Sequence, residues 1–206
     1  MADTYTTISG PAQAVFTEKR SKFLAFAFPV TTVAEARTHI DALAREYYDA
    51  RHVCWAYMLG YKRENFRAND NGEPSGTAGR PILGQINSRG FTDVLVVVVR
   101  YFGGIKLGTP GLIAAYREAS RLALEQATPE ERHVTERITF TYPYMVINDV
   151  MKLSRADGVK VLAHEMDNAC TMTLEVNLDA VAEVTRRLGD IDGVTFASEP
   201  TENDDE

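Results

Sequence analysis

The sequence contains only two cysteines, Cys54 and Cys170, and they form no C-x-x-C pair. This spacing argues against a disulfide framework and a zinc knuckle, and it favours the reducing environment of the cytosol. No apolar run approaches the ~20 residues that a membrane helix needs. The first ten residues, MADTYTTISG, lack the basic and apolar regions of a signal peptide. We therefore expect a cytoplasmic protein with no membrane partner.

Basic residues are also scarce, with 22 Lys and Arg against 29 Asp and Glu and a formal net charge of −7. This balance argues against a generic nucleic-acid binder. The charge is uneven, however. Residues 1–132 hold 16 basic and 14 acidic residues, whereas residues 133–206 hold 6 and 15. Residues 51–106 hold 8 basic and 4 acidic residues, so the acidic total conceals a locally basic segment.

Six apolar residues run without a break from position 94 to position 99, and Arg100 ends the run. A short aliphatic run of this kind predicts a strand buried on both faces in the middle of a sheet. The glycine pair at 103–104 predicts a tight turn. Thr109 and Pro110 predict the N-cap and the first residue of a following helix.

A strand, a glycine turn and a helix N-terminus in succession can bind an anion through backbone N–H groups. Arg100 and Lys106 would add positive charge to such a site. The stretch matches neither the P-loop nor the G-x-G-x-x-G fingerprint, so no cofactor is predicted. The alternative interpretation is a turn with a purely structural role.

The segment 69–81, NDNGEPSGTAGRP, belongs to a long loop expected over residues 61–81. Compact domains rarely carry loops above ~15 residues without a function or disorder. Asp70 and Glu73 are candidates for a general acid/base pair or for cation ligands. The glutamate that should end an EF-hand loop is missing, and no metal site is predicted. The alternative is that these residues only shape turns.

His52 and Cys54 alternate with apolar residues in the segment 51–60, which predicts a strand with both side chains on one face. A Cys–His nucleophile would need this proximity and a third, orienting group. The alternative is a buried cysteine beside a hydrogen-bonded histidine in a sheet. This structural pair is far more common than a nucleophile, so the pattern favours it.

Hydrophobic periodicity and turn signals predict an α+β protein of two domains. The first domain is expected to span residues 1–130. Besides the elements described above, it should contain strands at 12–18 and 22–30 and a helix capped by Thr32 and Glu35. Two more helices are expected, one at 82–90 and one that starts at Pro110 and ends before Pro129. A hinge is expected at 128–133. A second domain, residues 134–200, follows in the ferredoxin-like order βαββαβ. Its expected elements are strands at 134–142, 159–166, 169–178 and 193–199, and helices at 145–157 and 179–189, with Asp179 as an N-cap. Residues 201–206 are expected to form a disordered acidic tail.

Four motifs are specific when taken together and in order. They are KRSKF at 19–23, DARHVCWAY at 49–57, NDNGEPSGTAGRP at 69–81 and VVVRYFGGIKLGT at 97–109. This pattern resembles the YigZ/IMPACT family of uncharacterised or translation-linked proteins over essentially the whole chain. The resemblance implies a first domain of the ribosomal-protein-five second-domain type and a ferredoxin-like second domain, a pair similar to domains IV and V of elongation factor G. It also implies contact with RNA, a ribosome or a translation-factor partner.

The leading hypothesis is a cytosolic regulator linked to translation whose first domain binds RNA or a ribosomal partner. The residues predicted to contact nucleic acid or phosphate are Arg51, Arg80, Arg100, Gly103, Gly104, Lys106 and Thr109. One alternative is an enzyme acting on a small phosphorylated or nucleotide-like substrate, with His52, Asp70 and Glu73 as candidate catalytic residues. No complete catalytic constellation is present, so the sequence favours a role other than catalysis. The other alternative is a protein-interaction module that uses the acidic second domain.

Overall fold

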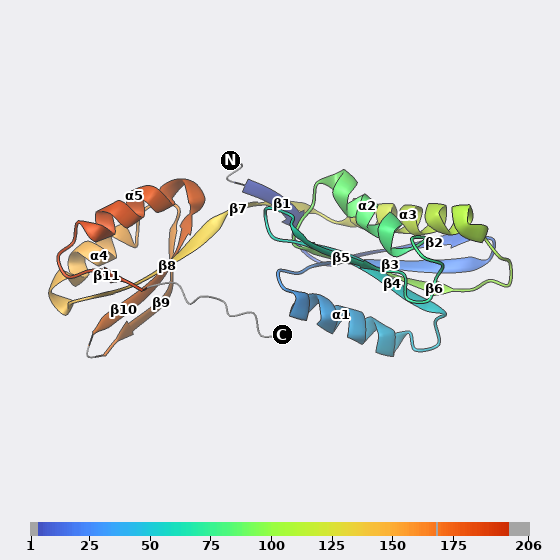
Figure 1. Ribbon diagram of the computed structural model, residues 1–206, viewed down its shortest axis with the longest axis horizontal. Coiled ribbons are helices and arrows are strands. Elements are labelled where there is room, and N and C mark those ends of the chain that lie inside the picture. Colours follow the sequence, from blue (N-terminus) through green and yellow to red (C-terminus); the bar gives the residue numbers. More distant parts are fainter. Residues whose placement is uncertain (1–3, 168, 198–206) are drawn as a thin grey trace. The chain divides into compact units, whose positions relative to one another are not determined.

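A computed structural model describes residues 4–167 and 169–197 (Figure 1). The predicted acidic tail, residues 201–206, lies outside the described residues. The chain divides into two compact units between Arg132 and His133. The segment 128–133, predicted as a hinge, contains strand β7, Pro129–His133, which pairs with strand β1, Thr4–Ile8. None of the helices in the described ranges is both long enough and apolar enough to cross a membrane.

The first unit contains a five-stranded antiparallel sheet in the order β2-β3-β6-β4-β5. Its strands are β2 Ala12–Glu18, β3 Ser21–Pro29, β4 His52–Leu59, β5 Asn65–Asn69 and β6 Val94–Tyr101. The aliphatic run forms β6, and residues 94–99 are fully buried. The prediction of a buried central strand is therefore confirmed.

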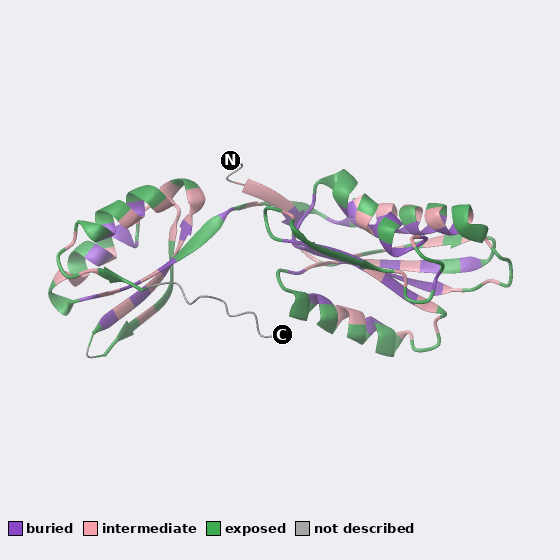
Figure 2. Cartoon of the chain, in the orientation of Figure 1, coloured by how far each residue is buried: buried purple, intermediate pink, exposed green. Residues whose placement is uncertain are grey.

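Helices cover both faces of this sheet (Figure 1). Helix α1, Val33–Glu46, lies on one face, and helices α2, Gly79–Arg89, and α3, Gly108–Gln126, lie on the other. Successive side chains of a strand point to opposite faces, so Val96 and Val98 pack in the α2/α3 core and Val97 and Val99 in the α1 core. Figure 2 shows the buried residues concentrated along these layers. An unbroken aliphatic run is what such a doubly covered strand requires.

The predicted helix starts are partly right. Thr32 Oγ1 accepts a hydrogen bond from the Glu35 N–H at 3.1 Å, and Glu35 Oε2 accepts one from the Thr31 N–H at 2.7 Å, so the capping signal is confirmed. Thr109 is not an N-cap. Helix α3 begins at Gly108, so Thr109 lies in its first turn.

The expected loop at 61–81 was wrong in part, because residues 65–69 form the edge strand β5. All of its side chains are exposed, so the strand has no alternation of buried and exposed residues for a sequence pattern to reveal. Backbone pairing with β4 holds it instead. Strand β1 was also missed.

The second unit has the element order βαββαβ that the sequence predicts. Its elements are β8 Thr135–Tyr142, the short 3₁₀ helix η1 Tyr144–Val146, α4 Ile147–Leu153, β9 Val159–Met166, β10 Cys170–Asn177, α5 Leu178–Gly189 and β11 Thr195–Phe196. The strands form an antiparallel sheet in the order β11-β8-β10-β9. Helices α4 and α5 pack on one face through a core that includes Phe140, Met172 and Leu188.

Three predictions for the second unit need correction. The helix expected at 145–157 ends at Leu153, and the last strand is the two-residue β11 rather than residues 193–199, of which 198 and 199 lie outside the described residues. Asp179 is not the N-cap, because α5 begins at Leu178 and Asn177 occupies that position. In the first turn, the Asp179 carboxylate complements the positive end of the helix dipole.

Candidate functional site

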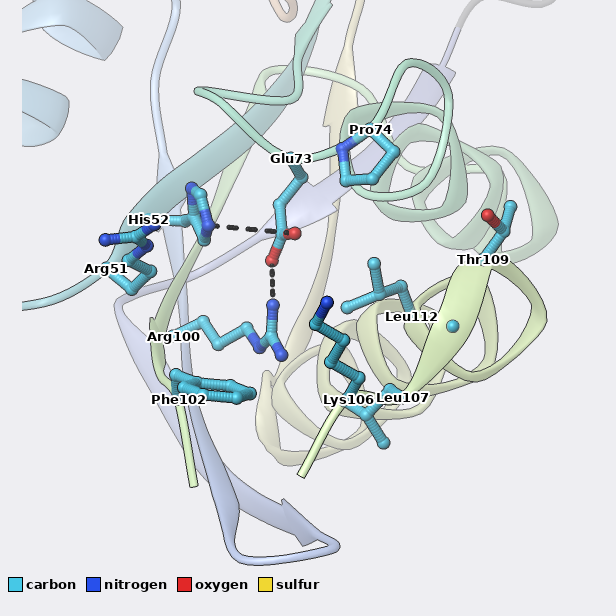
Figure 3. A pocket seen from close by; sticks show the side chains of 11 residues that line it. Arg51, His52, Glu73, Pro74, Arg100, Phe102, Lys106, Leu107, Thr109 and Leu112 are labelled. Atoms are coloured by element: carbon cyan, nitrogen blue, oxygen red, sulfur yellow. Dashed lines mark hydrogen bonds and ion pairs between the residues drawn. The ribbon is translucent and has the colours of Figure 1, made fainter. Parts of the chain in front are cut away.

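A cavity of about 590 Å³ opens on the first unit, among β4, β6, the 70–78 loop and the start of α3 (Figure 3). Its apolar walls are Pro74, Phe102, Leu107 and Leu112. Its charged and polar lining comes from Arg51, His52, Glu73, Arg100, Lys106 and Thr109. These six residues are all among those singled out from the sequence, and the fold gathers them from three separate motifs.

Strand register explains why two of these residues meet. His52 on β4 stands opposite Arg100 on β6 in the antiparallel ladder. Residues directly opposite each other project to the same side of a sheet, so both side chains lie on the α2/α3 face. Glu73 reaches them from the loop that precedes α2 (Figure 3).

Glu73 forms a buried ion pair at the floor of the cavity. Its Oε1 lies 2.6 Å from Arg100 Nη1, and the two side chains are only 3% and 6% exposed. The Tyr116 hydroxyl donates a second hydrogen bond to the same oxygen at 2.8 Å. Burial raises the pKa of Tyr116 far above its usual value, so this hydroxyl stays a donor. These two contacts fix the position of the Glu73 side chain at the cavity floor.

His52 is oriented by two acceptors. Its Nδ1 lies 2.8 Å from the Asn71 carbonyl oxygen, which can only accept, so Nδ1 carries a proton. Its Nε2 faces Glu73 Oε2 at 3.7 Å. The imidazole is therefore held in one orientation, with Nε2 beside a carboxylate at the cavity wall.

The Arg100 guanidinium is enclosed by aromatic rings as well as by Glu73. Its Cζ lies 5.6 Å from the ring centre of Phe23 and 5.7 Å from that of Phe102, within the range of cation–π attraction. Its Nε is buried and has no hydrogen-bond partner within residues 4–167 and 169–197. One donor of the guanidinium is thus left without an acceptor among the described residues.

Arg51 and Lys106 differ from Arg100 because both are exposed. The ion pairs found in the described part of the chain include neither of them. Figure 3 shows the Lys106 side chain extending toward the Arg100 guanidinium. These two cations supply the positive charge that the Glu73–Arg100 pair itself does not.

Asp70 lies only three residues before Glu73, but it does not line the cavity. Its Oδ1 accepts hydrogen bonds from the N–H groups of Ala78 and Gly79 at 2.9 and 2.8 Å, and its Oδ2 accepts one from Gly76 at 2.8 Å. Partial burial raises the pKa of Asp70, but these three hydrogen bonds and the charge of Arg80 outweigh it and lower the pKa overall. Asp70 therefore organises the loop and the start of α2, and its oxygens are occupied by backbone.

Replacing Asp70 by asparagine is expected to destabilise the protein by about 2 kcal/mol at pH 7, because charge-assisted hydrogen bonds to backbone are lost. A carboxyl group with a lowered pKa in the folded state stabilises above its unfolded pKa of about 3.9 and loses that contribution as the pH falls. The difference between wild type and Asp70→Asn should therefore shrink between pH 5 and pH 3, as measured by urea unfolding. A difference that is unchanged over this range would contradict the assignment.

Cys54 is not a nucleophile beside His52. Its Sγ is fully buried, 2.9 Å from the Asp70 carbonyl oxygen and 3.3 Å from the Tyr116 hydroxyl. Burial raises the pKa of the Cys54 thiol to about 12, so it stays protonated near neutral pH. The structure favours the alternative of a buried cysteine next to a hydrogen-bonded histidine.

Three of the predicted phosphate-contacting residues lie outside the cavity: Arg80, Gly103 and Gly104. Gly103 packs so closely on the turn between β2 and β3 that a Cβ would overlap the backbone of Arg20 and Ser21. Its N–H donates to Ser21 Oγ at 3.1 Å. The glycine turn therefore serves to position the segment that carries Lys106.

Sequence reasoning missed Phe102 and Tyr116 as members of the site. Tyr116 lies on the apolar face of the helix expected after Pro110. A tyrosine hydroxyl buried there needs a hydrogen-bond partner, and this requirement could have indicated a polar group nearby. No sequence feature indicated that Phe102 would line the cavity, because its exposure depends on the path of the chain after β6.

These features define an α+β protein of two domains with antiparallel sheets and a cationic cavity in the first domain. The family described as Impact N-terminal domain matches residues 19–124. The chain is 31% identical over 185 residues to the IMPACT family member YigZ of Escherichia coli strain K12, covering 88% of this chain and 90% of YigZ. It is 38% identical over 132 residues to YvyE of Bacillus subtilis strain 168, covering 64% and 61%. The chain belongs to the IMPACT family.

A solved structure extends the similarity to the whole fold. A crystal structure described as that of a hypothetical protein superposes with a TM-score of 0.78 and 27% identity, covering 98% of this chain and 100% of that one. The likeness therefore includes both domains.

Proposed function

We propose that this protein is a cytoplasmic regulator linked to translation and that its first domain binds single-stranded RNA at the cavity. The observation that carries the proposal is the cavity lining, in which the exposed cations Arg51 and Lys106 occur together with Phe102, a residue that is 49% exposed. Single-stranded RNA is bound by cations that contact phosphates and by aromatic rings on which bases stack. The link to translation is supported by the motif resemblance and not by the cavity.

The charge arrangement supports an anionic ligand. The Glu73–Arg100 pair is neutral in sum, so it neither attracts nor repels phosphate strongly at a distance. Arg51, Lys106 and the N-terminal end of α3 supply the net positive field. A concave site of this size admits an unpaired strand or a nucleotide, whereas the backbone of a duplex would stay at its rim.

Lys106→Met and Arg51→Met are each expected to weaken binding of a single-stranded oligoribonucleotide and to reduce the slope of log K against log salt by about 0.7, because each removes one phosphate contact. Isothermal titration calorimetry over a salt series measures both effects. Lys62→Met is the matched control, since Lys62 is exposed and lies outside the cavity. No RNA binding at low salt, or an equal effect of Lys62→Met, would overturn the proposal.

A second candidate is an enzyme acting on a small phosphorylated or nucleotide-like substrate. The observation in its favour is the fixed imidazole of His52, whose Nε2 faces Glu73 at the cavity wall. A histidine oriented in this way is suited to proton transfer. Turnover of a phosphate ester that is lost in His52→Gln, together with no RNA binding by the wild-type protein at low salt, would favour this candidate over the first.

We also propose a finer description of the two domains, with residues 1–130 of the ribosomal-protein-five second-domain type and residues 134–200 ferredoxin-like. The second assignment is supported by the βαββαβ order together with the sheet order β11-β8-β10-β9. The first is supported by the five-stranded sheet and its covering helices, together with the motif resemblance.

A further inference from the structure

The interior of the cavity contains a cation that lacks a full set of acceptors. Arg100 lines the cavity with a side chain that is 6% exposed, and Glu73 occupies its Nη1. Its buried Nε has no partner in the described part of the chain. The Nε has no exposed surface of its own, so an anionic acceptor in the cavity would contact the guanidinium through the small part of the Arg100 side chain that is exposed there.

The start of α3 contributes a second, independent anion-binding feature. This helix has 19 residues, no side chain caps its N-terminus and its first turn contains no acidic residue. Gly108 and Thr109 of that turn line the same cavity. The unpaired N–H groups at the start of a helix carry partial positive charge and favour phosphate. Lys106 stands two residues before the helix and extends toward Arg100 (Figure 3).

Lys106 and the start of α3 thus add positive charge beside Arg100, whose own charge is balanced by Glu73, and the apolar side chains of Phe102 and Leu112 line the same cavity. Resting on the RNA-binding function proposed above, we propose that the cavity holds the terminal phosphate of an RNA, a phosphomonoester, rather than an internal phosphodiester. The terminal nucleoside would lie against the apolar wall.

Charge and shape both favour a terminal group. A phosphomonoester carries between one and a half and two negative charges near neutral pH, on the order of twice the charge of a phosphodiester, and has three terminal oxygens to share among several donors. A chain end can enter a concave site with its phosphate foremost, whereas an internal phosphate carries a neighbouring nucleotide on each side. The volume of about 590 Å³ lies within the range of small-ligand pockets and suits one nucleotide.

The test compares three oligoribonucleotides of one sequence that end in a 5′-phosphate, a 3′-phosphate or hydroxyl groups only, titrated into the full-length protein by calorimetry. One of the two phosphate-ended RNAs is expected to bind about tenfold more tightly than the hydroxyl-ended RNA, as charge-assisted hydrogen bonds to the extra charge require. The RNA whose affinity is higher shows whether the 5′ end or the 3′ end enters the cavity. Lys106→Met should abolish the gain, and Lys62→Met should retain it.

The outcomes separate this inference from the function on which it rests. Equal affinity for all three RNAs, lowered equally by Lys106→Met, would overturn recognition of a terminal phosphate and leave RNA binding intact. Failure of all three RNAs to bind at low salt would overturn both. A gain that persists in Lys106→Met would place the terminal phosphate elsewhere and would also contradict the inference.

Discussion

Replacing Glu73 by alanine is expected to lower the free energy of unfolding of the first domain by about 3–5 kcal/mol, the usual cost of removing one partner of a buried ion pair. The variant leaves the Arg100 guanidinium buried without a counter-charge and leaves the Tyr116 hydroxyl without its acceptor. Urea unfolding followed by tryptophan fluorescence measures the effect. Trp55 is the only tryptophan and lies in β4, so the signal reports on this domain.

Two further variants test the reason for the loss. Glu64→Ala removes an exposed glutamate from the segment before β5, and it should change the stability by less than about 0.5 kcal/mol. The double variant Glu73→Leu with Arg100→Met removes both charges, and it should recover the part of the loss that comes from the unpaired guanidinium. The part that comes from the Tyr116 hydroxyl should remain, because its acceptor is still missing. If Glu73→Ala unfolds at the same urea concentration as Glu64→Ala, the ion pair does not stabilise the fold.

Replacing Gly103 by alanine is expected to destabilise the first domain by about 3 kcal/mol and to weaken RNA binding as well. The added methyl group would overlap backbone atoms of Arg20 and Ser21, which belong to the turn between β2 and β3 and its flank. Backbone cannot rotate aside as a side chain can, so the segment after β6 must shift, and Lys106 shifts with it. Thermal unfolding and RNA titration of the same variant measure the two effects.

Gly84→Ala is the matched control for Gly103→Ala. Gly84 lies within α2, and a methyl group there would have no neighbouring atom within 4 Å. Alanine favours helix over glycine by up to about 1 kcal/mol, so this variant should be at least as stable as wild type. If both variants unfold at the wild-type temperature, the contact between Gly103 and Arg20 does not constrain the turn.

The features that depend on local pattern could be predicted from the amino-acid sequence alone. The aliphatic run at 94–99 predicted a central strand because only a doubly covered strand buries six successive apolar side chains. Thr32 and Glu35 predicted the start of α1, since a capping residue acts on N–H groups three or four positions away. The βαββαβ order of the second domain likewise follows from successive periodicities. Four motifs together also indicated the family.

The different roles of candidate residues that are neighbours in the sequence could be seen only in the folded structure. Asp70 and Glu73 occupy one loop and carry the same charge, yet Asp70 accepts backbone N–H groups at the start of α2, whereas Glu73 meets Arg100 at the cavity floor. The difference depends on where β6 places Arg100 and on the burial of Tyr116 on the inner face of α3. These are distances between segments far apart in the chain, set by strand register and helix packing. No local pattern of residues encodes them, so the cavity became visible only in the folded domain.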